Sequence, residues 1–117
     1  MIDRRKVYIY RTTGEPKFSG LAMDCQIHQT PDGRNQLWFD ETGHGHMITG
    51  EIIKETPEGF TFRSDGYEPG AWTFQVLTIE DFRRWVYKHV TGGETIAAKI
   101  RTTADLHEWY RRAFDIP

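Results

Sequence analysis

Two histidines and a glutamate stand close together in the segment "TGHGHMITGE", residues 42–51. His44 and His46 are two residues apart, so in an extended strand their imidazoles point to the same side, as two ligands of one metal ion would. Glu51 is an odd number of residues from each histidine and would face the opposite side, unless a bulge at Gly50 resets the register. The segment is therefore either a divalent-metal site or a glycine-rich turn with exposed histidines.

The spacing His-x-His-x4-Glu over residues 44–51 resembles the first metal motif of the cupins, a family of small β-barrels. The resemblance implies a metal-dependent enzyme or sensor in which His44, His46 and Glu51 bind a divalent metal with a further histidine from a later strand. The chain departs from the motif in two places. Trp38 stands where the motif has a glycine, and the later segment "EPGAWTFQ" contains no histidine.

Two His-x-Thr tripeptides, His28-Gln29-Thr30 and His89-Val90-Thr91, resemble the twin motifs of the 2H phosphoesterases. In that family each histidine handles a proton while the hydroxyl group holds a phosphate oxygen. The family sets both motifs on strands, whereas His89 falls at the C-terminal end of a predicted helix, where a cationic imidazole complements the helix dipole. No catalytic residue is therefore assigned from the sequence.

The segment "SDGYEPGAW", residues 64–72, joins two predicted strands through glycine and proline. It presents Tyr67 between Asp65 and Glu68, and Trp72 follows at its end. An aromatic ring flanked by carboxylates on a rigid loop suits contact with a cationic protein surface. We expect these four residues to form a binding site, and the alternative is a plain connection whose tyrosine folds onto the sheet.

Charge is unevenly distributed along a chain whose net charge is only -2. Residues 13–70 carry four basic side chains against ten acidic ones, while the remaining basic residues lie nearer the two ends. A surface of one sign attracts partners of the other, so this block favours a protein partner with a basic surface. The alternative is an ordinary solubilising surface.

A second alternative function is nucleic-acid binding through Arg83, Arg84 and Lys88 on one predicted helix. Glu80 and Asp81 lie beside these basic residues, so few counterions would be released when a phosphate backbone binds. This interleaving argues against a nucleic-acid partner.

Length and cysteine content limit the possible classes of protein. A chain of 117 residues is about one domain, and we expect one, with a β portion over residues 1–77 and a helical portion over residues 78–117. The chain has one cysteine, Cys25, which favours a reducing, cytoplasmic compartment, and no long apolar run suggests a membrane span. A homo-oligomer is compatible with these observations.

Alternation of apolar and polar residues with a period of two predicts antiparallel strands in the first two thirds of the chain. In "MDCQIHQ" the alternation places Met23, Cys25 and Ile27 on one face. The six predicted strands are KVYIYR, MDCQIHQ, QLWFD, MITGEIIKE, GFTFRS and AWTFQVLT.

Two of the expected turns share the pattern Ile-x-x-Thr-Pro-acid-Gly, at residues 27–33 and 53–59. Proline fixes φ at the first corner, and glycine is expected to take the left-handed conformation that closes the loop. Each pattern therefore predicts a hairpin.

Helical spacing replaces alternation in the last third of the chain. Thr78 followed by Asp81 predicts a capped helix over residues 78–90, and Thr102 or Thr103 begins a second helix. Residues 94–101 are ambiguous between strand and helix, with two alanines favouring helix. The predicted fold is α+β, mainly β: a bent antiparallel sheet or small barrel of five to six strands with two C-terminal helices.

These observations together predict a small cytoplasmic binding protein without catalytic activity or cofactor. In size and charge it is similar to inhibitors and immunity-type proteins that present an acidic surface to a basic partner.

Overall fold

The computed structural model describes residues 2–18, 20–65 and 69–116. The chain divides into two compact units, a β unit (Met1–Val76) and a helical unit (Leu77–Pro117). The predicted boundary between the β and helical portions, after residue 77, lies one residue from this division. That the whole chain forms one domain stays a prediction.

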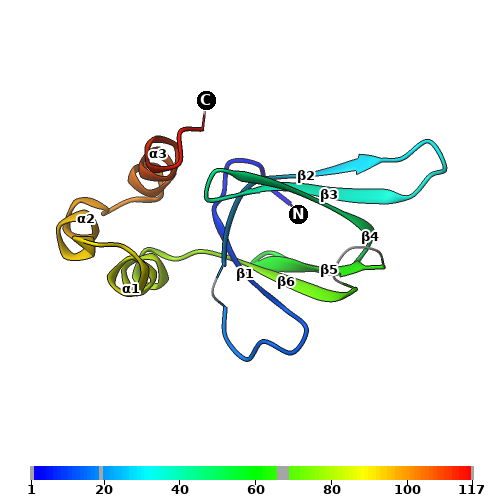
Figure 1. Ribbon diagram of the computed structural model, residues 1–117, viewed down its shortest axis with the longest axis horizontal. Coiled ribbons are helices and arrows are strands. Elements are labelled where there is room, and N and C mark those ends of the chain that lie inside the picture. Colours follow the sequence, from blue (N-terminus) through cyan, green and yellow to red (C-terminus); the bar gives the residue numbers. More distant parts are fainter. Residues whose placement is uncertain (1, 19, 66–68, 117) are drawn as a thin grey trace. The chain divides into compact units, whose positions relative to one another are not determined.

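The β unit is a closed barrel in which every pair of neighbouring strands is antiparallel (Figure 1). Each strand pairs with the next in the sequence, and β1 pairs with β6 from Tyr8↔Val76 to Thr12↔Trp72, which closes the barrel. The small-barrel prediction is therefore confirmed. The strands are β1 (Tyr8–Thr12), β2 (Gly20–Gln29), β3 (Asn35–Glu41), β4 (His44–Thr56), β5 (Gly59–Ser64) and β6 (Gly70–Val76).

Aromatic rings fill the interior of the barrel because inward positions on neighbouring strands fall opposite one another. Phe60 and Phe74 are register partners and stack with ring centroids 4.6 Å apart. Tyr10 stacks on the other side of Phe74 at 5.2 Å. The buried interior residues are Tyr8, Tyr10, Ala22, Cys25, Leu37, Phe39, Ile48, Phe60, Phe62, Trp72 and Phe74.

A bulge in β2 breaks the alternation that the sequence predicted. Asp24 has a φ of 61°, and the register with β3 shifts between Met23 and Gln26. Ala22 and Cys25, three residues apart, therefore both belong to the interior, whereas Met23 does not. The expectation that Met23 shares a face with Cys25 was wrong, because an extra residue in one strand reverses the order of inward and outward side chains.

Both hairpins predicted from the repeated turn pattern are present. Gly33 has a φ of 85° and donates its backbone N–H to Thr30 O at 2.9 Å, as expected for a left-handed glycine. Gly59 does not have a positive φ and is already the first residue of β5. The conformation predicted for Gly59 was therefore wrong.

The helical unit contains α1 (Ile79–His89), α2 (Gly93–Lys99) and α3 (Thr103–Ala113). The cap predicted for the first helix is confirmed, because Thr78 Oγ1 accepts the N–H of Asp81 at 3.1 Å. Thr102 caps α3 in the same way and forms a reciprocal capping box with Asp105. The ambiguous segment adds a third helix, α2, to the two that were predicted.

None of the helices in the described part of the chain has the length and apolar character needed to cross a lipid bilayer.

Candidate functional site

The two histidines of the opening segment lie in β4, and the turn precedes them. Thr42 and Gly43 have φ values of 48° and 94°, the positive pair that a two-residue hairpin of type I′ requires. His44 is the register partner of Glu41, and His46 is the partner of Phe39. The hairpin turn expected at Gly43 is present and His44 is exposed, but Gly45 and both histidines belong to β4, which begins directly after the turn.

His46 belongs to a polar cluster at one end of the barrel. Its ring stacks on Phe39 with centroids 5.1 Å apart, and its Nε2 lies 3.1 Å from Glu41 Oε1. Tyr10 donates its hydroxyl hydrogen to Glu41 Oε2. A phenol, a carboxylate and an imidazole thus link β1, β3 and β4, a grouping that no sequence motif indicated.

Glu51 lies apart from this cluster, because its carboxylate pairs with Arg63, its register partner on β5. Over residues 2–18, 20–65 and 69–116, no three His, Cys, Asp or Glu side chains lie close enough together to hold a metal ion. The carboxylate that lies beside the imidazole of His46 belongs to Glu41, and Glu51 pairs with Arg63 instead. Divalent-metal binding by His44, His46 and Glu51 stays a prediction.

The loop predicted to bind a partner is only partly described. Asp65 is exposed and pairs with Arg34 of the β2–β3 turn, while Tyr67 and Glu68 lie outside the described residues. Trp72 is 3% exposed and stacks on Tyr10 in the barrel interior, with centroids 5.5 Å apart. The indole of Trp72 therefore packs in the core, below the surface that a partner would contact.

The basic residues of the nucleic-acid alternative interact within the helical unit. Arg83 donates to Ile100 O at 3.2 Å, and Arg84 pairs with Glu80 at 2.6 Å. Lys88 is exposed in the last turn of α1. Nucleic-acid binding stays a prediction.

One cysteine and the two histidines of the His-x-Thr tripeptides carry groups that could act as a nucleophile or transfer a proton. Cys25 is fully buried, and burial raises the pKa of its thiol, so the reactive thiolate is disfavoured. His28 packs against Trp38 with ring centroids 4.6 Å apart. His89, the partner in the twin-motif resemblance, ends α1 in the other compact unit.

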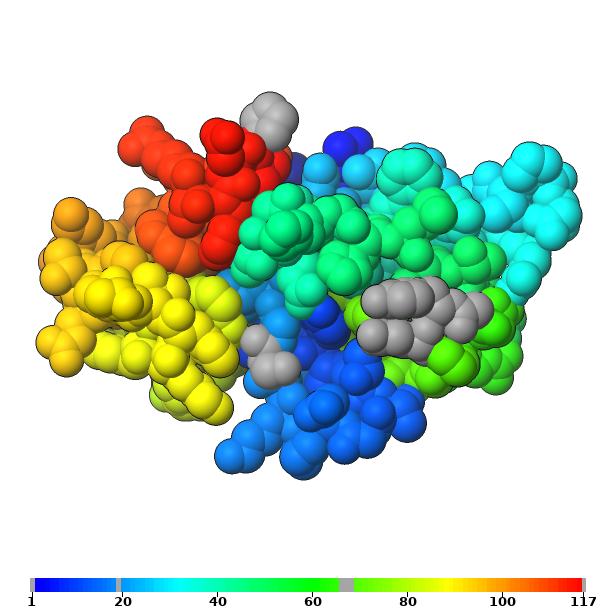
Figure 2. Space-filling view, viewed as in Figure 1, coloured from blue at the N-terminus to red at the C-terminus, as the bar shows by residue number. Residues whose placement is uncertain are grey.

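The outer face of β2, β3 and β4 carries exposed side chains that the sequence analysis did not single out as a site. Trp38 is 44% exposed and Met47 is 52% exposed, and the two are direct register partners on β3 and β4. Gln26 of β2 pairs with Trp38 on its other side. The β3–β4 hairpin lies at the visible surface of the β unit in Figure 2.

A hollow of about 340 Å³ opens on this face, which we call the β2–β4 hollow. Gly45 lies opposite Asp40 in the register, and a Cβ atom added at Gly45 would have no neighbour within 4 Å, so the space above it is open. The residues that line the hollow include Asp24, Gln26, Trp38, Asp40, Gly45 and Met47.

Hydrogen bonds fix the positions of the polar side chains that line the β2–β4 hollow. Asp40 Oδ1 accepts the N–H of Gly43 at 2.9 Å, and Asp24 Oδ1 accepts Arg4 Nε–H at 3.1 Å. Trp38 Nε1–H donates to Gln36 Oε1 at 3.2 Å. An exposed indole and two carboxylates therefore share one concave surface.

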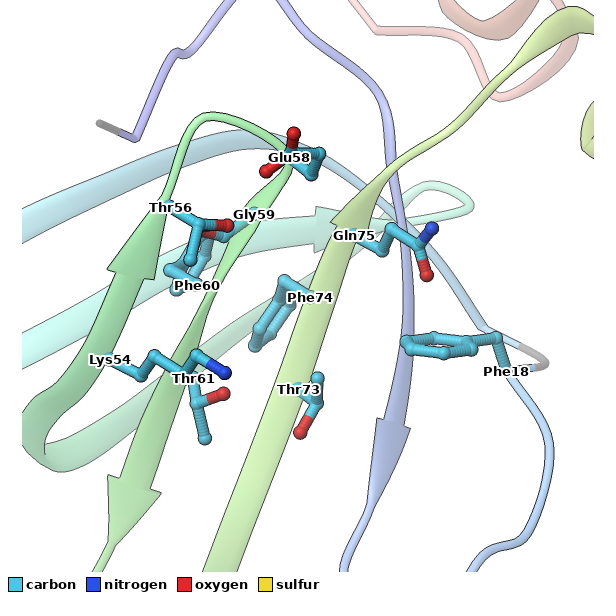
Figure 3. Close-up of a pocket in the computed structure, with 10 residues that line it drawn as sticks. All are labelled: Phe18, Lys54, Thr56, Glu58, Gly59, Phe60, Thr61, Thr73, Phe74 and Gln75. Carbon is cyan, nitrogen blue, oxygen red and sulfur yellow. The ribbon is translucent and has the colours of Figure 1, made fainter.

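A second depression, which we call the β4–β6 groove, has a different chemistry (Figure 3). Its volume is about 190 Å³. Lys54, Thr61 and Thr73 are register partners across β4, β5 and β6, and Figure 3 shows them beside one another, with Phe18 on the far side of β6. An ammonium group, hydroxyl groups and the carboxylate of Glu58 line this groove, whereas an indole and two carboxylates line the hollow.

Comparison with known proteins gave no match to any protein-family model, curated protein or solved structure.

Proposed function

We propose that this protein is a cytoplasmic, non-catalytic binding protein of the inhibitor or immunity type, and that it docks a partner with a basic surface on the outer face of β2, β3 and β4. One observation carries the proposal. Trp38 and Met47, large apolar side chains, lie exposed side by side on a face whose hollow is also lined by Asp24 and Asp40.

Exposed tryptophan and methionine support a protein partner because both residue types are enriched in protein interfaces. Tryptophan in particular is over-represented among the few residues that dominate binding energy. Trp38 is also held in place by its contacts with His28 and Gln36, so little rotamer freedom would be lost on binding.

The carboxylates of the same face support a partner of positive charge. Complementary potentials guide encounter and suppress wrong partners, even where they add little affinity. The residues that line the β2–β4 hollow all come from the acidic segment, residues 13–70. The carboxylates of the hollow and the net negative charge of this segment therefore favour the same kind of partner, one with a basic surface.

A photo-crosslinking experiment tests the location of the face. Benzoylphenylalanine placed at Met47 should capture the partner, whereas the same group at Thr61 in the β4–β6 groove should not. The captured protein is then purified, and its affinity for the wild type, Trp38→Ala and Thr61→Ala is measured by calorimetry. We expect Trp38→Ala to weaken binding about thirtyfold and Thr61→Ala to leave it unchanged. Equal affinities for the two variants, or equal capture from both faces, would contradict the proposal.

The loop predicted from the sequence has its own test. Reversing charge at Asp65 and Glu68 weakens partner capture if that loop also contacts the partner, and unchanged capture would remove the loop from the binding surface. Thermal unfolding is the control, because Asp65 is exposed and its pair with Arg34 contributes at most about 1 kcal/mol.

A further inference from the structure

We infer that the β2–β4 hollow receives an arginine side chain of the partner. The inference rests on the proposed function and names the chemical group that the face recognises. Three features of the hollow support it: the exposed indole of Trp38, the carboxylates of Asp24 and Asp40, and the open space above Gly45.

The indole and the carboxylates suit the two parts of a guanidinium group. The flat face of a guanidinium stacks on an aromatic ring, while its N–H groups form a planar fork that matches carboxylate oxygens. Trp38 supplies the ring, and Asp24 and Asp40 supply the oxygens. Met47, beside Trp38, offers an apolar surface to the methylene stem of an arginine.

The size of the hollow suits one side chain. Its volume, about 340 Å³, is near the lower end of the range for pockets that hold small molecules. Gly45 contributes to this volume because any side chain there would project into the open space.

A guanidinium of this chain already contacts one wall of the hollow. Arg4 Nε–H donates to Asp24 Oδ1 at 3.1 Å, so the carboxylate of Asp24 accepts the group that we assign to the partner. The Arg4 side chain is 63% exposed, and an exposed pair of this kind is worth little. Arg4 therefore competes weakly with an incoming arginine, which leads to an unusual expectation: removing Arg4 should strengthen binding.

Arginine is preferred over lysine for a physical reason. The lysine ammonium is a compact, strongly hydrated charge without a flat face, so it would lose hydration beside Trp38 without gaining a stacking contact. The β4–β6 groove provides the contrast on the same barrel, because Lys54 offsets the charge of Glu58 in its lining and no indole is present there for a guanidinium to stack on.

Titration of the intact protein with N-acetyl-arginine amide, followed by NMR, tests the inference without any protein partner. The indole N–H of Trp38 and the amides of Gly45 and Met47 should shift and saturate with a dissociation constant of about 1 mM. N-acetyl-citrulline amide, which has nearly the same shape but no charge, should bind about tenfold more weakly because charge-assisted hydrogen bonds are lost. N-acetyl-lysine amide should bind about threefold more weakly than the arginine amide.

Variants assign the binding to the hollow. Trp38→Ala and Asp40→Asn should each weaken arginine binding about fivefold or more, while Arg4→Ala should strengthen it. Asp24→Asn should also weaken it, and asparagine is chosen because it tolerates the positive φ at this position. Lys54→Ala, in the β4–β6 groove, is the matched control and should change nothing.

The inference would be overturned by equal shifts with citrulline, by shifts confined to the β4–β6 groove, or by arginine binding that Trp38→Ala leaves unchanged. Concentration-dependent broadening of the Trp38 signal without ligand would also overturn it, by making a second copy of this chain the occupant. Partner capture at Met47 without any arginine binding would refute the inference and keep the docking face. Arginine binding without capture at Met47 would support an arginine site in the hollow and refute docking of the partner on the outer face of β2, β3 and β4.

Discussion

The turn between β2 and β3 and the turn between β4 and β5 share the pattern Ile-x-x-Thr-Pro-acid-Gly, at residues 27–33 and 53–59. Gly33 has a φ of 85°, and a Cβ atom there would have no neighbour within 4 Å. Gly59 has no positive φ, but a Cβ atom there would overlap the carbonyl oxygen of Phe74 on β6. The first glycine is needed for its backbone conformation, and the second for the close approach of a neighbouring strand.

The first turn is held by its own side chains. The Thr30 hydroxyl donates to the Asp32 carboxylate and accepts the N–H of Arg34 at 3.0 Å. Thr30 and Arg34 also form a backbone hydrogen bond of 2.8 Å. This turn therefore depends on contacts within five consecutive residues.

The second turn is held by β6. Glu58 O accepts the N–H of Val76 at 2.7 Å, and Gly59 pairs with Gln75. The Thr56 hydroxyl makes only a long contact of 3.4 Å with Gly59 O. One sequence pattern thus gives two hairpins with different sources of stability, and the difference can be measured.

Gly59→Ala should have the largest effect. The new Cβ would press on the Phe74 carbonyl and force β5 away from β6, so we expect the free energy of unfolding to fall by about 3 kcal/mol. Urea denaturation followed by tryptophan fluorescence measures this change. A loss below about 1 kcal/mol would show that the two strands separate easily, and the close approach would no longer explain the glycine.

Gly33→Ala should cost less, about 1–2 kcal/mol, because the open space removes any clash and only the left-handed backbone is strained. Gly33→Asn should recover part of this loss, since asparagine tolerates that conformation. The same denaturation experiment applies. If asparagine is no better than alanine at Gly33, backbone conformation is not what the first turn requires.

Thr30→Val and Thr56→Val form a matched pair with a smaller difference. Thr30→Val removes two hydroxyl hydrogen bonds and should destabilise the protein by about 1 kcal/mol. Thr56→Val removes only a long contact and should cost less than about 0.5 kcal/mol. Denaturation midpoints in urea compare the two variants. Equal losses would mean that the first turn does not depend on its own side chains.

The smallest effect concerns pH. The Thr30 hydroxyl, by donating to Asp32, holds the pKa of that carboxyl below its ordinary value. A lowered pKa in the folded state stabilises the fold above the unfolded value of about 3.9, and this contribution is lost as pH falls through the folded value. NMR titration of the Asp32 carboxyl should show the lowered pKa in the wild type and a rise in Thr30→Val. An identical pKa in both proteins would assign the shift to another group.

Local features of the fold could be predicted from the sequence because they depend on neighbouring residues. The caps at Thr78 and Thr102 each involve a residue three positions later, and both hairpins follow from proline and glycine. The bulge at Asp24 could not be predicted, because only pairing with β3 reveals where the extra residue sits.

The candidate site was less predictable, although one signal was present. In "NQLWFDE" alternation places Leu37 and Phe39 on one face and Trp38 on the other, which marks an outward tryptophan. The hollow beside it depends on register between strands, which alternation does not give. The contact between Tyr10 and Glu41 likewise joins distant parts of the chain.

The seam between β1 and β6 has a consequence for biosynthesis. β1 is made first among the strands and pairs on one side with β6, which is made last. While a ribosome is still translating the intervening segment, one edge of β1 has no native partner, and aromatic side chains destined for the interior face solvent or a chaperone. Contacts between such distant segments also form slowly. We therefore expect ribosome-bound chains to become resistant to protease only after β6 has left the exit tunnel.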